Sequence, residues 1–204
     1  MVGYHKYVFD QKKRLVVAKF EEMYQAEDVE NYNSWHQEDM RHLTKQLSLV
    51  LLNRYNFNNI LDVGCGKGSF THLLKKENNR VTGIDISKTA IRRAKARFPD
   101  IAFSCVDLTK NSFKKKPFFA EHYDLLVFME VLSYLPNWSK VLEDFAPIGD
   151  YILITLDIPE NPIGYVKSKE SLKSSVEKSY VILDELYLSR YHKTIIFGKS
   201  LMFK

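Results

Sequence analysis

Cysteine is scarce in this chain of 204 residues, which contains only Cys65 and Cys105. Two cysteines cannot build the disulfide framework of small extracellular folds, so we expect both as reduced thiols in the interior. The six histidines show no pairing with cysteine at the spacing of a zinc site. The sequence therefore predicts a fold held by its apolar core, with no structural metal.

Long apolar runs are also missing, and none approaches the length of about 20 residues that spans a bilayer. Residues 1–7 contain no apolar stretch of the signal-peptide kind. These absences predict a cytoplasmic protein without a membrane span. The length suits one domain, which can bury a core without disulfides or metals.

Charge of one sign is not concentrated in any part of the chain. The net charge is +5, but the lysines and arginines are spread along the sequence in groups of two or three. Such groups are typical of solvated faces, and no nucleic-acid recognition module accompanies them. A nucleic-acid partner is therefore not expected. The sequence carries no signal of oligomeric state.

A glycine-rich turn is the most informative feature that is present. Residues 60–70 read Ile-Leu-Asp-Val-Gly-Cys-Gly-Lys-Gly-Ser-Phe, a short apolar strand, a turn with three glycines and the start of a helix. In an open α/β sheet this order builds a ligand crevice at the carboxyl edge. Glycines let the backbone approach a ligand closely, and the helix that follows directs its free N–H groups to the same place.

A nicotinamide dinucleotide site is the first alternative, because its pattern is G-x-G-x-x-G. Here residue 69 is serine, and the third glycine is Gly68. Asp62, just before the turn, would repel a pyrophosphate but would suit a cation. About twenty residues further on, a second apolar segment ends in Asp85, a carboxylate placed to accept hydrogen bonds from a ribose diol. A ribose with a cationic, phosphate-free head describes S-adenosylmethionine.

Four motifs together resemble the class I S-adenosylmethionine-dependent methyltransferases. They are LDVGCGKG at 61–68, GIDIS at 83–87, FSCVDL at 103–108 and YDLLVFMEVLSYLP at 123–136. The resemblance implies a Rossmann-like, doubly wound α/β fold with a seven-stranded sheet, mostly parallel and with an antiparallel last strand. It also implies a single domain, with an N-terminal helical cap over residues 1–56 and the Rossmann-like core over residues 57–204.

The same resemblance suggests which residues bind the cofactor. Asp107 would meet the exocyclic amine of adenine, and Leu108 would lie against the ring. Trp35 and Arg41 look like an aromatic-then-arginine pattern that related enzymes use near the cofactor's carboxylate; alternatively, Trp35 is a half-buried packing residue and Arg41 is solvated. The residues expected to bind the cofactor are Asp62, Gly64, Cys65, Gly66, Gly68, Asp85, Ile86, Asp107, Leu108, Met129, Trp35 and Arg41.

The N-terminal residues are expected to be helical in two places. An apolar stripe predicts a helix over residues 12–27, and Ser34 with Gln37 fits a capping box that opens a long helix to about residue 54. Further predicted elements are a helix at 87–98 capped by Ser87, a strand at 101–105, a surface loop at 110–122, strands at 124–129 and 151–157, helices at 138–145 and 168–177, and an antiparallel strand pair at 180–188 and 193–203.

Methyl transfer is an in-line displacement at a sulfonium carbon, so the protein must chiefly align the acceptor and exclude water. A general base is needed where the nucleophile is an alcohol. The catalytic residues expected at the transferred methyl are Glu130, Tyr134 and His36, and His42, Asp157 and Glu160 are further base candidates. Tyr134 stands where related enzymes often carry histidine, which excludes a histidine base from that position.

The acceptor is indicated by similarity. The chain lacks the Asn/Asp-Pro-Pro-aromatic loop of base-amine methyltransferases, and the sequences at 130–135 and 158–164 are similar to bacterial small-molecule methyltransferases of the nodulation-factor N-methyltransferase type. This similarity implies transfer to an oxygen or nitrogen of a small polar metabolite, expected to be a saccharide or another intermediate of cell-surface glycan (capsule) modification. The alternatives are a nucleic-acid methyltransferase and a non-catalytic subunit that binds the cofactor.

Overall fold

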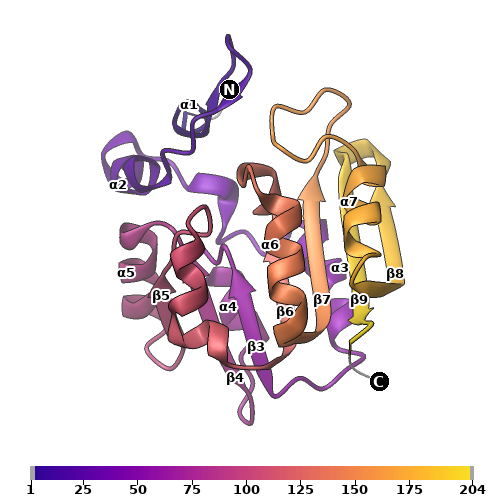
Figure 1. The fold of residues 1–204 in the computed structure, drawn as a ribbon. Helices are drawn as coiled ribbons and strands as arrows, with labels where there is room; N and C mark the ends of the chain where they lie inside the picture. The colour runs from indigo at the N-terminus through magenta and orange to yellow at the C-terminus, as the bar shows by residue number, and fades with distance from the viewer. Residues whose placement is uncertain (1–2, 203–204) are drawn as a thin grey trace.

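A seven-stranded sheet forms the centre of the computed structural model, which describes residues 3–202 (Figure 1). In spatial order the strands are β5 (Ala102–Cys105), β4 (Arg80–Asp85), β3 (Asn59–Val63), β6 (Tyr123–Met129), β7 (Gly149–Asp157), β9 (Lys193–Ser200) and β8 (Tyr180–Leu188). Neighbours from β5 to β7 are parallel, and β9 is antiparallel to both β7 and β8. The predicted mostly parallel sheet with an antiparallel last strand is confirmed.

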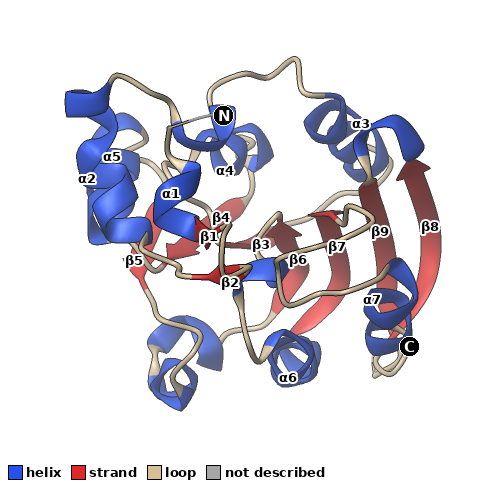
Figure 2. Ribbon diagram, turned by 90° about the horizontal axis from the view of Figure 1, so that it is seen from above, coloured by secondary structure: helices blue, strands red, loops and turns tan. Residues whose placement is uncertain are grey.

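Helices cover both faces of the sheet. Figure 2 shows α6 and α7 on one face and α3 and α4 on the other. Residues 125–128 of β6 are each at most 1% exposed, as expected for a continuous apolar run in a parallel sheet. The helices of these layers are α3 (Leu43–Leu52), α4 (Ser69–Leu74), α5 (Lys88–Arg97), α6 (Trp138–Phe145) and α7 (Lys169–Val176).

The strand order creates a place for a ligand. The chain moves outward from β3 to β4 and β5 and then returns to the other side of β3 with β6. Connections after β3 and β6 therefore leave on opposite faces, which is the switch point where open α/β sheets bind ligands. The N-terminal elements lie over this edge in Figure 1; they are α1 (His5–Val8), β1 (Phe9–Asp10), β2 (Leu15–Val16) and α2 (Phe20–Glu30).

Local signals explain where several elements begin. The Ser87 hydroxyl accepts a hydrogen bond from the backbone N–H of Ala90 at 3.0 Å, so the predicted cap of α5 is confirmed. Ser168 and Ser171 form a capping box at the start of α7. Within residues 3–202, no helix is both long enough and apolar enough to cross a membrane.

The predicted helix over residues 12–27 is wrong in its first half. β1 and β2 pair there as an antiparallel hairpin, and α2 begins only at Phe20. Arg14 and Ala18 have φ angles of +52° and +51°, a left-handed backbone that an α-helix of L-residues does not pass through. The apolar stripe is helical only from Phe20 onward, where Met23 and Tyr24 are buried.

The predicted long helix from Ser34 is also wrong. Residues 34–36 form a short 3-10 helix, η1 (Ser34–His36), and α3 begins at Leu43. The Ser34 side chain makes no capping bond, and Trp35 and His36 have φ angles of +59° and +47°. Tertiary contacts of Gln37, described below, replace the local capping box.

The segment at 110–122, predicted as a surface loop, contains two 3-10 helices. Phe113 and Phe118 from this segment are buried against Phe145 of α6. Short 3-10 turns carry no helical periodicity, so the sequence pattern did not indicate them. The two 3-10 helices of this segment are η2 (Asn111–Lys115) and η3 (Pro117–Ala120). Three more follow later in the chain: η4 (Leu132–Tyr134), η5 (Ala146–Ile148) and η6 (Ser189–Tyr191).

Candidate active site

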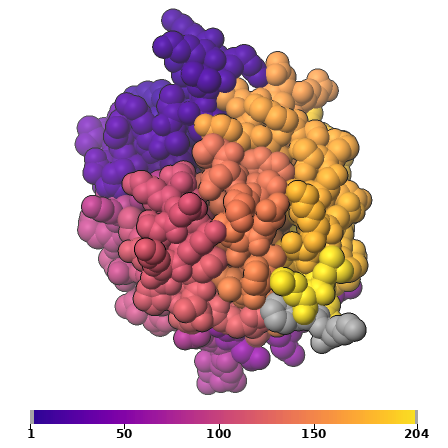
Figure 3. Space-filling view, in the orientation of Figure 1, coloured from indigo at the N-terminus to yellow at the C-terminus, as the bar shows by residue number. Residues whose placement is uncertain are grey.

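A cavity of about 650 Å³ lies at the carboxyl ends of β3, β4, β6 and β7. Its volume is typical of sites for small molecules and cofactors. The N-terminal segment and the loop at 159–164 wall it from opposite sides, and they meet in the space-filling view (Figure 3). Arg14 joins them, because its Nη2 donates to the backbone and side-chain oxygens of Asn161 at 2.9 and 2.6 Å.

The glycine turn after β3 forms one wall of the cavity. Gly64, Gly66 and Gly68 have φ angles of +77°, +55° and +79°, which L side chains rarely adopt. The carboxylate of Asp85 fixes the turn from β4, since it accepts from the backbone N–H groups of Gly66 and Ser87, each at 2.9 Å. Asp85 therefore ties the turn to the end of β4.

Asp62 is buried just below this turn, with only 2% of its surface exposed. The Thr71 hydroxyl donates to its carboxylate at 2.6 Å. Burial raises the pKa of Asp62 to about 7, since Thr71 offsets only part of the desolvation and the nearby charge of Asp85 raises the pKa further. Burial also raises the pKa of Asp85. A cationic ligand at this end of the cavity would favour the ionised form of both groups.

Most of the residues predicted to bind the cofactor line the cavity. These are Asp62, Gly64, Cys65, Asp85, Ile86, Leu108, Met129 and Trp35. Gly66 and Gly68 do not line the cavity. Gly68 lies against Phe103, where an added Cβ would be 2.7 Å from the ring, and Gly66 lies against the side-chain amide of Gln37.

Two predicted cofactor residues lie away from the cavity walls. The Asp107 carboxylate accepts from the backbone N–H and hydroxyl of Thr109 at 3.0 and 2.6 Å and pairs with Lys110. The Arg41 side chain is 90% exposed and pairs with Asp39 at 2.9 Å. Arg41 was predicted to lie on a helix that begins at Ser34. The helix α3 begins only at Leu43, so Arg41 lies outside it.

Aromatic side chains wall the cavity at the end of β6. Tyr134 of η4 contacts the rings of Phe9, Phe20 and Trp35 at centroid distances of 5.9, 5.3 and 5.5 Å. Burial raises the pKa of Tyr134 well above its usual value. The phenol therefore stays protonated near neutral pH, which opposes a role for Tyr134 as a base.

Glu130, Asp157 and Lys193 form a charged cluster beside this aromatic wall. Glu130 directly follows β6 with a φ angle of +57°, and its carboxylate accepts from the Asp157 backbone N–H at 2.9 Å. The Lys193 Nζ lies 3.1 Å from Glu130 and 3.4 Å from Asp157. Burial alone would lower the pKa of Lys193, but the two carboxylates outweigh it and raise that pKa. Lys193 was not predicted, because it is the first residue of β9, far along the chain from the motifs, and carries no sequence signal of a site.

His36 and His42 also line the cavity, with ring centroids 6.2 Å apart. Burial and the charge of Lys45 lower the pKa of His42, which keeps this ring neutral. The Lys45 ammonium donates to the backbone carbonyls of Gln37 and Asp39 at 2.8 and 3.1 Å. Lys45 therefore holds the segment that carries both histidines. Glu160 is absent from the residues that line the cavity.

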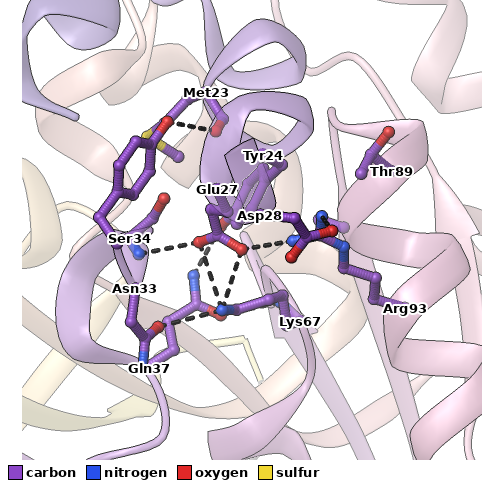
Figure 4. A network of polar contacts seen from close by, with 12 residues as sticks. Met23, Tyr24, Glu27, Asp28, Asn33, Ser34, Gln37, Lys67, Thr89 and Arg93 are labelled. Atoms are coloured by element: carbon purple, nitrogen blue, oxygen red, sulfur yellow. Dashed lines mark hydrogen bonds and ion pairs between the residues drawn. The ribbon is translucent and has the colours of Figure 1, made fainter. Parts of the chain in front are cut away.

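The N-terminal segment contacts the glycine turn through residues to which the sequence gave no role in the site (Figure 4). Gln37 accepts from the backbone N–H of Lys67 at 2.8 Å and donates to the Tyr24 hydroxyl at 2.6 Å. The Lys67 ammonium is held by Glu27 of α2. A glutamate on an amphipathic helix is ordinarily solvated, so no pattern indicated that Glu27 is buried.

The sequence is similar to known methyltransferases over the stretch that contains the glycine turn and Asp85. Residues 61–148 match the family model of a methyltransferase domain. The ubiquinone biosynthesis O-methyltransferase of Coxiella burnetii is 31% identical over 96 residues, which are 44% of this chain and 38% of that protein. The chain thus matches about two fifths of the length of this relative. The predicted resemblance to the S-adenosylmethionine-dependent methyltransferases is confirmed.

Solved structures share the fold. The N-methyltransferase NodS of Bradyrhizobium japonicum, in complex with S-adenosyl-L-homocysteine, has a TM-score of 0.67 at 20% identity, over 87% of this chain and 98% of that one. The [4+2]-cyclase SpnF has a TM-score of 0.65 at 15% identity, over 82% of this chain and 83% of that one. At these identities the similarity concerns the fold, and the chemistry has to be argued from the site.

Proposed function

We propose that this chain, which carries a methyltransferase domain at residues 61–148, transfers the methyl group of S-adenosylmethionine to an oxygen or nitrogen of a small polar molecule. One observation carries the proposal. The same cavity of about 650 Å³ is walled by the glycine turn and Asp85 on one side and by the cluster of Glu130, Asp157 and Lys193 on the other. A cofactor and an acceptor can therefore meet in one cavity.

The residues on the side of the cavity formed by the glycine turn and Asp85 fit the cofactor. Asp85 has a carboxylate at the end of β4 that can accept hydrogen bonds from a ribose diol. Ile86 and Leu108 offer apolar surface for a flat base, and buried Asp62 favours a cationic head. A pyrophosphate would meet the charge of Asp62 instead, and residue 69 is serine, which argues against a nicotinamide dinucleotide.

The bound cofactor would supply an activated methyl group on its sulfonium. The chain's own residues then have to exclude water and orient the acceptor. Trp35 and Tyr134 supply an apolar wall beside the end of β6, and residues 159–164 cover the opposite side. Glu130 is placed to receive a proton from an acceptor hydroxyl, while the Lys193 ammonium holds the carboxylate in position.

The side of the cavity formed by Glu130, Asp157, Lys193 and the aromatic wall supports the proposed class of acceptor. An aromatic wall next to carboxylates and an ammonium suits a molecule with an apolar ring face and several hydroxyl or amino groups. A saccharide has both features, so a saccharide intermediate of surface-glycan modification remains part of this proposal. The cytoplasmic location also remains a prediction.

Two alternatives are less well supported. A nucleic-acid methyltransferase would gather free cations around the cavity, whereas Lys193 is paired with two carboxylates and Lys45 is bonded to backbone carbonyls. A non-catalytic subunit would lack room for an acceptor, whereas the cavity continues past Met129 to the loop at 159–164.

Calorimetric titration of the purified protein with S-adenosylhomocysteine and, separately, with NADH tests the cofactor. We expect micromolar binding of the first and none of the second. Methyl transfer from labelled S-adenosylmethionine to sugars, phosphorylated sugars and amines then tests the acceptor class. Binding of NADH alone, or of neither compound, would contradict the proposal.

A further inference from the structure

Lys67 points away from the cavity, although it belongs to the glycine turn. Its side chain is 10% exposed, and its ammonium lies between residues of the N-terminal segment (Figure 4). It donates to both carboxylate oxygens of Glu27, at 3.1 and 3.2 Å, and to the side-chain oxygen of Asn33 at 3.0 Å. The turn is therefore attached to α2 and to the segment that follows it.

Glu27 joins three parts of the chain at one point. Its side chain is 3% exposed, and it also accepts from the backbone N–H of Ser34 at 2.8 Å and pairs with Arg93 of α5. The Nη2 atom of Arg93 pairs with the carboxylate of Asp28 at 2.8 Å. A buried carboxylate with these partners is costly to separate from them, because each charge would lose its compensation.

The backbone of the turn is held from two opposite sides at consecutive residues. The N–H of Gly66 donates to Asp85 of the sheet, and the N–H of Lys67 donates to Gln37 of the N-terminal segment. Loss of either contact would free the turn on that side. The end of the turn at Lys67 is thus held by residues 24–37, whereas its start is held by the sheet, since Gly64 and Cys65 donate to the Ile84 carbonyl.

We propose that Lys67 is a positioning residue that couples docking of residues 24–37 to cofactor affinity. This inference rests on the proposed function, because it assumes that the turn binds S-adenosylmethionine. Undocking would expose Glu27 and Lys67 to water together and release the turn. By reciprocity, a ligand that needs the docked turn must stabilise the docked N-terminal segment.

Three variants test the proposal by calorimetry with S-adenosylhomocysteine. Lys67→Met removes the ammonium but leaves Glu27 paired with Arg93, and we expect about tenfold weaker binding, the effect of about 1.4 kcal/mol. Lys67→Arg keeps a cation and should restore most of the affinity. The control is Glu38→Gln, which removes the charge from the exposed Arg97–Glu38 pair between α5 and the N-terminal segment and should leave the affinity unchanged.

Hydrogen–deuterium exchange supplies a readout that a purely structural role would not change. In the wild type, S-adenosylhomocysteine should slow exchange in residues 20–37, and in Lys67→Met this protection should be lost. If Lys67→Met melts at a much lower temperature without ligand, Asn33→Ala serves in its place, since it removes only a neutral partner of Lys67.

Unchanged affinity in Lys67→Met would overturn the proposal, as would protection of residues 20–37 that survives the substitution. Equal weakening in Glu38→Gln would overturn it too, because the effect would then be a general one of the interface. If the wild type binds no S-adenosylhomocysteine, the proposed function fails. The mechanical link from Lys67 to the turn is then judged separately by whether Lys67→Met speeds exchange in residues 64–68 of the ligand-free protein.

Discussion

The side-chain amide of Gln37 occupies the space that any side chain on Gly66 would need. A Cβ at Gly66 would lie 2.5 Å from both the oxygen and the nitrogen of this amide. The amide is itself fixed by Lys67 and Tyr24. Gly66 is therefore required by a residue 29 positions earlier in the chain as well as by its own φ angle of +55°.

Gly66→Val should accordingly abolish measurable binding of S-adenosylhomocysteine, because the branched side chain would displace Gln37 or enter the cavity. Calorimetry measures the effect, and Gly3→Ala, which has open space around it, is the control. In the smaller Gly66→Ala variant, a second substitution of Gln37→Ala should recover part of the affinity. Wild-type affinity in Gly66→Val would remove the turn from the cofactor site.

Asp85→Ala should weaken S-adenosylhomocysteine binding by about 1–3 kcal/mol, the scale of hydrogen bonds to a charged group. That loss corresponds to roughly 5- to 150-fold in the dissociation constant. Asp184→Ala removes another carboxylate, which pairs with Arg54 at the far edge of the sheet, and should leave binding intact. If both variants bind as the wild type does, Asp85 is not the ribose partner.

Asp62 should make stability depend on pH in an unusual direction for a carboxylate. Its pKa is about 7 in the folded protein, against 3.8 as the ordinary value, so the folded state binds the proton more tightly. The contribution of Asp62 to the free energy of unfolding is then fully present below pH 3.8 and is lost as the pH rises through about 7. Asp62→Asn should flatten this part of the profile. Thermal melts of both proteins from pH 5 to 8 measure the difference, and parallel profiles would contradict the assignment.

Glu130→Gln should leave S-adenosylhomocysteine affinity intact and slow methyl transfer to a hydroxyl acceptor by roughly 10²- to 10⁴-fold, the usual contribution of a general base. The amide retains the shape of the carboxylate but cannot take a proton. Transfer to an acceptor found in the screen should be followed under single-turnover conditions. A rate equal to that of the wild type would leave alignment alone as the role of Glu130.

Glu27→Ala should lower the free energy of unfolding by about 3–5 kcal/mol, because Lys67 would remain buried without its carboxylate and Arg93 would keep only Asp28. Urea unfolding of the ligand-free protein measures this loss. Glu38→Ala breaks a half-exposed pair and should change the midpoint little. A small effect of Glu27→Ala would mean that water reaches Lys67 and Arg93 readily.

The sheet was predictable because its strands are continuous apolar runs bounded by turn residues. The mostly parallel sheet, its antiparallel last strand and the Ser87 cap of α5 agree with the prediction. The N-terminal elements were not predictable, since their apolar periodicity is correct only from Phe20 onward. Positive φ angles at Arg14, Ala18, Trp35 and His36 interrupt the helices there, and none of these residues is a glycine that would have indicated a break.

Some residues around the cavity were predictable from the sequence and others were not. Asp62, Gly64 and Asp85 stand at strand ends, where topology fixes their position. Lys193 and Gln37 reach the cavity only through tertiary packing, from the start of β9 and from an irregular segment. Arg41, for which the sequence left a cofactor contact and a solvated side chain both open, is exposed and pairs with Asp39.

Part of the second side of the cavity is encoded outside the stretch that matches the methyltransferase domain model, although Glu130 and Tyr134 lie within it. The glycine turn and Asp85 fall within residues 61–148, whereas Phe9, Trp35, Asp157 and Lys193 lie outside that range. Acceptor choice can therefore diverge during evolution by changes in the flanking stretches, while the central stretch is inherited with little change. Two descendants of one ancestor could then share this central stretch and modify different molecules, and exchanging the flanks between them would exchange their substrates.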